Sequence, residues 1–186
     1  MGRAVVGGLF RAANGIARFR GCASMWPRPP LVRGRALIRV HATGRLDIGE
    51  GFVVDATPLP SQFIVGPNAQ MKFGVDCFVN YGCDLHAAYS VTFGDNCMIG
   101  PQVYVLDDAW HETAPGSRRF APIVVGTNVW LSRGVAVLPG VTIGDHTVVA
   151  SGAVVTKSLP DRVLAAGVPA VPLRTIDVPD RSWRRS

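Results

Sequence analysis

The chain has 186 residues, of which 48% are hydrophobic, with a formal net charge of +6 at pH 7 and a mean hydropathy of +0.24. This length predicts one domain with a proper core, and no run approaches the roughly 18 uncharged apolar residues that a membrane-spanning helix needs. The positive charge belongs to the start of the chain, because nine arginines precede Asp47, the first acidic residue. The slightly acidic remainder gives no reason to expect a nucleic-acid partner.

Residues 1–36 form a basic arm, and residues 3 to 20 of it are predicted to be helical. Arginines and other polar residues fall on one side of that helix, and Val5, Leu9 and Ile16 fall on the other. Two roles remain open: the helix covers an open end of the core, or it makes peripheral contact with anionic lipid through residues 1–20. A cleaved signal peptide is not expected, because Arg11 interrupts the apolar segment.

The segment from Val125 to Pro160 repeats every six residues. Each block begins with an aliphatic residue, namely Val125, Leu131, Val137, Ile143, Val149 and Val155. The fifth place of each block is apolar or small: Val129, Val135, Val141, Thr147, Ala153 and Leu159. A period of six preserves the two-residue alternation of a strand and is not helical. Three short strands would therefore close a coil of eighteen residues, and coils would stack about 4.8 Å apart.

The same register continues upstream, with two irregular steps. Blocks begin at Phe73, Val79, Leu85, Phe93, Ile99 and Val105, and their fifth places are Cys77, Cys83, Tyr89, Cys97, Val103 and Ala109. Ile48 and Val65 are further expected block starts. The step from Leu85 to Phe93 is eight residues, so one corner carries two extra residues. The step from Val105 to Val125 is twenty, which predicts an excursion loop over residues 107–123. The repeat domain is predicted over residues 37–176, followed by a flexible tail at 177–186.

Three of the four cysteines, Cys77, Cys83 and Cys97, occupy inward fifth places, and the fourth is Cys22. No CxxC motif is present. These positions predict buried structural thiols, without a disulfide or metal site, in a reducing cytoplasm.

Several motifs resemble one family of enzymes. They are Asn80 in VNYGC, His111 in the excursion loop, NVW at 128–130, LPGVTIGD at 138–145 and VVTKSLPDRVLAAGVPA at 154–170. Over about residues 65 to 176 the sequence resembles the hexapeptide-repeat acyltransferases, in particular the galactoside and maltose acetyltransferases and the O-acetyltransferases of surface polysaccharides. The resemblance implies an all-β, left-handed parallel β-helix, although right-handed crossovers are the general preference. It also implies a homotrimer with active sites at subunit boundaries, and acetyl-CoA as donor without a metal.

The resemblance assigns catalytic roles to three residues. His111 is expected to act as a general base that takes the proton of an acceptor hydroxyl as the hydroxyl attacks the thioester. Asp108 either orients the imidazole of His111 or is a solvated loop carboxylate; Asp107 and Glu112 are weaker candidates. Asn80 matches an asparagine that faces the catalytic histidine across a subunit boundary, and its alternative role is to stabilise a corner.

The binding residues are also implied by the resemblance. Ala87 falls where the galactoside enzymes have a substrate-binding aspartate, so the hydroxyls of the acceptor must be recognised differently here. His86, beside Ala87, is a candidate contact. Expected donor contacts are Trp130, Ser132 and Ser151 along a groove, and Thr156, Lys157 and Arg174 at its carboxy-terminal end. Val171 replaces an arginine that is frequent in the family, which Arg162 could compensate.

The expected reaction is acetyl transfer from acetyl-CoA to a hydroxyl of a sugar, glycolipid or polysaccharide precursor. N-acetylation of an amino sugar is the closest alternative. A non-catalytic scaffold would not need the combination of His111, Asn80 and Trp130. A γ-class carbonic anhydrase binds zinc through three histidines, but His111 has no second histidine within ten residues. A serine acetyltransferase is not expected, because these residues do not contain the large helical amino-terminal domain of that enzyme.

Overall fold

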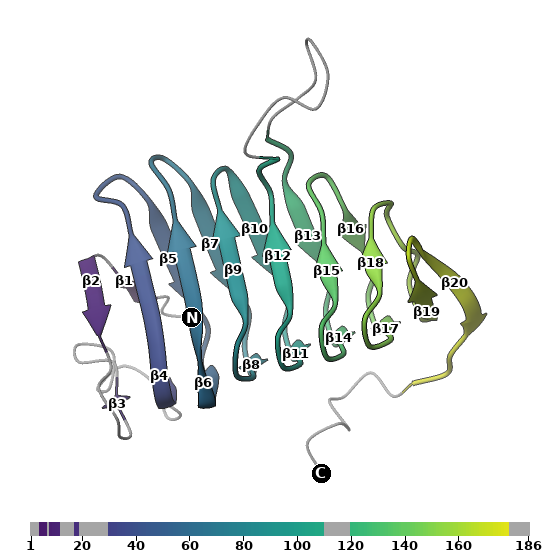
Figure 1. Ribbon diagram of the computed structural model, residues 1–186, viewed down its shortest axis with the longest axis horizontal. Coiled ribbons are helices and arrows are strands. Elements are labelled where there is room, and N and C mark those ends of the chain that lie inside the picture. The colour runs from purple at the N-terminus through teal and green to yellow at the C-terminus, as the bar shows by residue number, and fades with distance from the viewer. Residues whose placement is uncertain (1–3, 7, 12–16, 19–29, 110–119, 179–186) are drawn as a thin grey trace.

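The computed structural model describes residues 4–6, 8–11, 17–18, 30–109 and 120–178, and within these residues all regular structure is β-strand. The strands form a parallel β-solenoid whose coils follow one another along the long axis of the molecule (Figure 1). None of the described residues belongs to a helix of the length and apolarity needed to cross a membrane.

The solenoid has three faces and three kinds of corner. The first face contains the later parts of β4 (Leu31–Val40) and β6 (Val53–Val65), and then β9 (Asp84–Ala87), β12 (Tyr104–Leu106), β15 (Ala136–Val137) and β18 (Val154–Val155). The second face contains β5 (Arg45–Ile48), β7 (Gln70–Phe73), β10 (Ser90–Phe93), β13 (Ile123–Val125) and β16 (Thr142–Ile143). The third face contains β8 (Phe78–Val79), β11 (Met98–Ile99), β14 (Trp130–Leu131), β17 (Val148–Val149) and β19 (Val163–Gly167).

The register confirms the predicted eighteen-residue coil. Val125 pairs with Ile143, Leu131 with Val149 and Val137 with Val155 in parallel ladders. All the predicted block starts are buried, with exposed fractions of 2% or less. The extra corner residues account for the pairing of Phe73 with Phe93, and the excursion loop for the pairing of Phe93 with Val125. Each coil therefore contributes the same inward positions to one continuous core.

The core changes from aromatic to aliphatic along the solenoid. Phe73 and Phe93 occupy equivalent places in adjacent coils, and their rings stack with centroids 4.7 Å apart and an interplanar angle of 1°. Phe52 and Phe63 pack against Phe73 at 4.8 and 6.0 Å. Beyond Phe93 the same column continues as Val125 and Ile143. The ring spacing in the stack follows from the spacing of the coils.

Two predicted inward positions are not buried, because Ala109 is half-buried and Tyr89 is exposed. Tyr89 was expected to be a buried fifth-place residue, but it is 56% exposed. Ala87 and Val91 fill the core on either side of it, with exposed fractions of 2% and 0%. The two extra residues of this corner, Ala88 and Tyr89, therefore bulge outward and restore the alternation at Ser90.

The predicted helix over residues 3 to 20 is also wrong for the described part of the arm. The backbone there forms β1 (Ala4–Val6), β2 (Gly8–Arg11) and β3 (Ala17–Arg18). β1 pairs antiparallel with β5, and β2 and β3 pair antiparallel with β4. The first coil would otherwise expose a row of unpaired backbone groups, and strand pairing satisfies them, as a helix could not. Gly7 and Gly8 also disfavour a helix.

The carboxy-terminal end of the solenoid is closed by a hairpin. β19 turns into β20 (Ala170–Thr175), which pairs antiparallel with it. Beyond this hairpin the chain folds back, because Nη1 of Arg162 donates to the carbonyl of Val178 at 2.9 Å and Ile176 and Val178 are buried. Residues 176–178 therefore belong to the folded unit.

Glycine and aspartate interlock at the corner between the second and third faces. The side chain of Asp95 accepts a hydrogen bond from the amide of Val75 in the preceding coil, Asp145 from Thr127 and Asp161 from Asp145, at 2.6 to 2.9 Å. A Cβ atom added to Gly126 would overlap Oδ1 of Asp145. The Gly-Asp sequence of this corner is thus needed because each aspartate occupies the space above the glycine of the coil before it.

The cysteine thiols also contact backbone carbonyl groups of the following coil. Sγ of Cys77, Cys83 and Cys97 lies 3.0 to 3.2 Å from the carbonyl oxygen of Gly94, Gly100 and Gly126 respectively. All three are buried and free. Burial raises the pKa of Cys83 to about 11 and raises the pKa of Cys97 well above its usual value.

We predict that Gly126→Ala destabilises the protein by about 2–4 kcal/mol, because the new methyl group must displace the carboxylate of Asp145 or the corner. Gly66→Ala is the matched control, since the nearest atom to its Cβ would be 3.5 Å away. Thermal unfolding at one protein concentration measures both. The double variant Gly126→Ala/Asp145→Ala should recover part of the loss, because the remaining neighbours of that Cβ lie at 2.9 Å or more. Equal melting temperatures for Gly126→Ala and Gly66→Ala would contradict the interlock.

We predict that the three described thiols of the folded protein do not react with a thiol reagent at pH 8. With a pKa of about 11, Cys83 is about one part in a thousand thiolate at that pH, and burial excludes the reagent. The experiment uses Cys22→Ser, so that only these three thiols are counted. Full labelling should require guanidinium, and rapid labelling of the native variant would refute the prediction.

Candidate functional site

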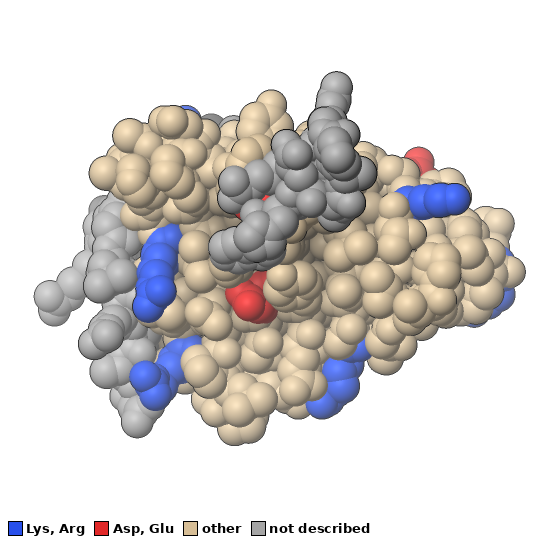
Figure 2. All heavy atoms as spheres, turned by 45° about the horizontal axis from the view of Figure 1, so that its top comes forward, with Lys and Arg blue, Asp and Glu red and all other residues tan. Residues whose placement is uncertain are grey.

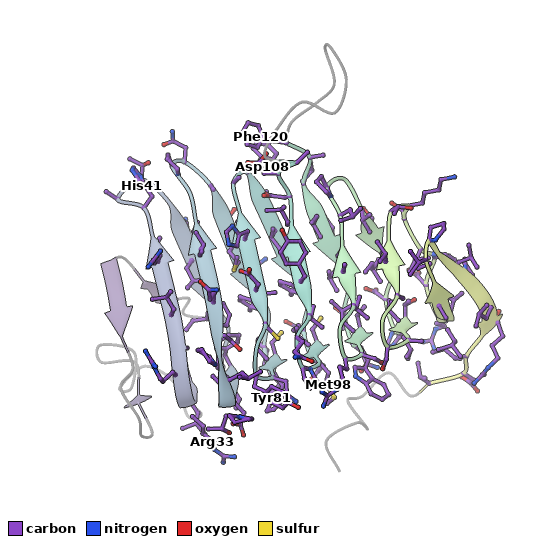
Figure 3. All side chains as sticks on the ribbon, viewed as in Figure 1. Arg33, His41, Tyr81, Met98, Asp108 and Phe120 are labelled. Atoms are coloured by element: carbon purple, nitrogen blue, oxygen red, sulfur yellow. The ribbon has the colours of Figure 1, made fainter. Side chains whose placement is uncertain are left out.

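The excursion loop leaves and re-enters the solenoid at a narrow base. Asp108 and Phe120 form an antiparallel bridge, and the amide of Ala121 donates to the carbonyl of Asp107 at 3.0 Å. Figure 3 shows Asp108 and Phe120 together at the corner where the first face meets the second. His111, the predicted base, lies outside the described residues, three positions beyond Asp108. The structure thus fixes the base of the loop that carries His111.

Asp107 holds the irregular corner in the coil below. Its carboxylate accepts hydrogen bonds from the backbone amides of Ala88, Tyr89 and Ser90 at 2.7, 2.9 and 2.6 Å, and the residue is fully buried. These amides belong to the corner with two extra residues, where the regular ladder cannot pair them. Asp107 was a weaker candidate for orienting the imidazole, but its carboxylate is occupied in supporting the backbone below the loop.

Asp108 lies immediately beside this support. It is 5% exposed and takes part in the bridge to Phe120. The alternative of a solvated loop carboxylate is therefore wrong, because the residue is buried at the base of the loop. The orienting role stays a prediction, because His111 lies outside the described residues.

Asn80 follows β8 at the corner between the third and first faces. Its Oδ1 accepts a hydrogen bond from the amide of Tyr81 at 2.8 Å, and its carbonyl accepts one from the hydroxyl of Ser61 at 2.8 Å. Its side chain therefore stabilises the corner, and its amide NH₂ group has no hydrogen-bond partner among the described residues. Both predicted roles of Asn80 are compatible with this geometry.

Asn80 and Asp108 lie at opposite edges of the first face. Figure 3 shows Tyr81, the neighbour of Asn80, at one end of the strands and Asp108 at the other. A strand path of about five residues separates the two corners, or roughly 17 Å. One chain therefore does not bring Asn80 to the base of the loop.

His86 and Ala87 lie on β9 and point in opposite directions. The side chain of Ala87 is in the core and 2% exposed. The side chain of His86 faces outward, is 16% exposed, and has Nε2 3.2 Å from Oδ1 of Asp84 on the same strand. His86 pairs in register with Leu106, two residues before Asp108. Of the two residues, His86 is the one on the outer surface near the loop.

The predicted donor residues fall into separate groups. Trp130, 37% exposed, points outward from the third face, whereas Ser132 is buried just after β14, and Ser151 lies at the equivalent corner of the next coil. Thr156 and Lys157 lie at the opposite end of β18, and Arg174 lies on β20. A ligand touching both groups must follow a corner or lie between two copies of the chain. Arg162, proposed to compensate for Val171, donates instead to Val178.

The other histidines are in structural or exposed places. His146 is a corner residue with φ of 60°, and its Nδ1 lies 3.0 Å from Nδ2 of Asn128. His41 is exposed and contacts Thr43. Within the described residues, no three histidine, cysteine, aspartate or glutamate side chains gather in a metal-binding group.

Comparisons with known proteins agree with the repeat. The family model "Bacterial transferase hexapeptide (six repeats)" matches residues 122–157. The galactoside O-acetyltransferase of Escherichia coli is 36% identical over 128 residues, which cover 67% of this chain and 62% of that protein. This chain thus spans less than two thirds of that relative.

Two solved structures show similar coils. A galactoside acetyltransferase in complex with coenzyme A is 37% identical, with a TM-score of 0.53, over 57% of this chain and 56% of that chain. A mutant GDP-perosamine N-acetyltransferase from Caulobacter crescentus, in complex with CoA and GDP-perosamine, is 28% identical, with a TM-score of 0.56, over 77% and 55%. Its eighteen-residue register and these matches show that the chain carries the hexapeptide repeat of the bacterial transferases.

Proposed function

We propose that the protein is a CoA-dependent O-acetyltransferase that acts on a sugar hydroxyl, whether in a free sugar, a glycolipid or a polysaccharide precursor. The observation that carries the proposal is the 37% identity to a galactoside acetyltransferase that binds coenzyme A. The two ends of the excursion loop are joined by hydrogen bonds at the solenoid, which supports the proposal, because catalytic groups on loops need a rigid scaffold. Acetyl-CoA is the donor.

The reaction is a direct acyl transfer. The imidazole of His111 takes the proton of the acceptor hydroxyl as its oxygen bonds to the thioester carbonyl carbon. The tetrahedral intermediate then collapses, the carbon–sulfur bond breaks, and the imidazolium returns the proton to the CoA thiolate. Asp108, buried at the base of the loop, orients the imidazole and stabilises its charged form. The amide NH₂ of Asn80, supplied by a neighbouring chain, donates a hydrogen bond to the acceptor or the intermediate.

We propose that the site is completed by a second copy of the chain in a homotrimer. Asn80 and Asp108 are separated by the full width of a rigid face within one protomer, so a neighbour must supply one of them. A threefold ring of identical chains would form three such sites. The same arrangement would let the donor reach Trp130, Ser132 and Ser151 on one chain and Thr156, Lys157 and Arg174 on the next.

We also infer that the solenoid is left-handed and that the repeat domain, predicted over 37–176 after an arm over 1–36, extends over residues 31–178, because β4 pairs with β6 from Leu31 and Val178 is buried. In Figure 1 the strands of the first face rise in front, the second face lies behind them, and the coils advance to the right. A chain that rises in front and descends behind while it advances to the right follows a left-handed path. The three described free thiols support a cytoplasmic site of action. Contact of residues 1–20 with anionic lipid stays a prediction.

N-acetyl transfer to an amino sugar is the second candidate, because the Caulobacter crescentus neighbour is named as an N-acetyltransferase. A panel of methyl glycosides of neutral sugars and of amino sugars is incubated with acetyl-CoA and analysed by mass spectrometry. This panel separates the two candidates. An ester or an amide product identifies the nucleophile. If no member of the panel accepts an acetyl group from acetyl-CoA, both candidate activities are contradicted and a non-catalytic scaffold is favoured.

We predict that His111→Ala lowers kcat by about 10² to 10⁴, because the acceptor hydroxyl loses its general base. The KM for acetyl-CoA should change little. His41→Ala is the control, since His41 is an exposed histidine of the first coils. A His111→Ala enzyme with turnover within about threefold of the native enzyme would exclude this residue as the base.

We predict that two inactive variants restore activity when they are co-expressed. In a mixed ring of His111→Ala and Asn80→Ala chains, one boundary joins an intact His111 to an intact Asn80. Random 1:1 mixing should therefore give about a quarter of native activity, because about three quarters of trimers are mixed and each has one intact site in three. Mass spectrometry of tagged chains verifies mixing. Mixed trimers as inactive as either parent would show that the site does not cross the boundary.

A further inference from the structure

The first face carries a row of polar side chains that the proposed reaction does not use. Gln62 on β6, Asp84 on β9 and Tyr104 on β12 pair in register and point outward from three consecutive coils. We call these three residues the polar row. They are partly exposed, and backbone register holds them about 4.8 Å apart. His86 lies beside Asp84 on the side towards the excursion loop.

Asp84 has an oxygen without a hydrogen bond. Oδ1 is buried and has no hydrogen-bond partner, although Nε2 of His86 lies 3.2 Å away at ion-pair distance. The contact brings the two groups together without hydrogen-bond alignment. The Asp84 side chain as a whole is 37% exposed, so a ligand can reach the carboxylate through its other oxygen, Oδ2, while Oδ1 stays covered. A carboxylate that is partly removed from water favours a ligand that brings hydrogen-bond donors.

The surroundings restrict the charge of that ligand. The register neighbours of Asp84, Gln62 and Tyr104, are uncharged, and on the face seen in Figure 2 the lysine and arginine side chains lie towards the margins. A carboxylate or phosphate bound beside Asp84 would meet a like charge without a neighbouring guanidinium or ammonium group in the polar row. The phenol of Tyr104 and the amide of Gln62 offer a flat apolar surface and further hydrogen bonds. These features suit a neutral or amino pyranose ring.

We propose that Asp84, together with His86, Gln62 and Tyr104, forms the acceptor subsite and selects a neutral or amino sugar over a uronic or sialic acid. The inference rests on the proposed acetyl transfer and names the substrate class of that same site. The position fits, because Leu106 pairs with His86 and the chain reaches the base of the loop at Asp108 two residues later. Asp84 contributes the acceptor for hydroxyl or ammonium hydrogens, which Ala87, buried in the core, cannot do.

The test compares native enzyme with Asp84→Asn, which keeps the size of the side chain and removes its charge. The probes are methyl glucoside, methyl glucosaminide and methyl glucuronide, with acetyl-CoA as donor. The native enzyme should prefer the first two. Asp84→Asn should raise the KM for methyl glucosaminide about 10- to 100-fold, leave the KM for acetyl-CoA unchanged and reduce discrimination against the glucuronide. Asp55→Asn is the matched control, because Asp55 is paired with Arg33 on the first coils.

Direct binding separates this inference from the proposed function. Saturation-transfer NMR of methyl glucosaminide should give a signal with the native protein and with Asp55→Asn, and lose it with Asp84→Asn. Such a result without any acetyl transfer would support the subsite and refute the transferase proposal. Normal transfer that is insensitive to Asp84→Asn would overturn the subsite and leave the transferase standing. The subsite would also be overturned if Asp84→Asn altered only the stability of the trimer. It would be overturned as well if the native protein neither bound nor acetylated the probes.

Discussion

Coil-to-coil backbone hydrogen bonding is the constraint on which the rest of this structure depends. Every residue of a strand is paired with the residue one coil away, so the chain cannot add a residue within a face without disrupting both neighbours. Added residues must leave at a corner. Two departures, at Ala88–Tyr89 and after Leu106, occur at the same kind of corner in adjacent coils, and a third lies within β6, where the register shifts between Ala56 and Ser61. Asp107 connects the first two, because it begins the second departure and its carboxylate binds the amides of the first. The excursion loop thus starts from a corner that also supports an earlier irregularity.

The repeating part of the fold could be predicted because inward positions follow one simple period. Val125, Leu131 and their equivalents are buried as expected, and the eight-residue step correctly located an irregular corner. The period could not show which residue of that corner would be exposed, so Tyr89 was misplaced. It also could not predict the arm, where pairing with the unpaired edges of β4 and β5 outweighs the helical spacing of Val5 and Leu9. Tertiary pairing decides such segments.

The candidate site was only partly accessible from the sequence. Spacing identifies the loop and the outward direction of His86. It does not show that the carboxylate of Asp107 accepts hydrogen bonds from three backbone amides. The separation of Asn80 from Asp108 is likewise a property of the assembled prism, which is rigid because its core is continuous along the axis. A face that cannot bend keeps its two corners apart. The proposed sharing of the site between chains is therefore the simplest way to bring these two residues together, and the stiffness of the coil supports that proposal.

The same rigidity bears on how acceptors are selected. On a strand with strict alternation, the residue at 87 points into the core, and a charged group there would be buried without a partner. In the proposed acceptor subsite, recognition comes from residues 84 and 86, which point outward on either side of Leu85. Their neighbours one coil away, Gln62 and Tyr104, are fixed in register by the ladder, so the spacing of polar groups is set by the backbone. A family that keeps its coil unchanged can thus alter its acceptor by exchanging outward residues of a few adjacent strands, because those exchanges leave the core and the loop base untouched.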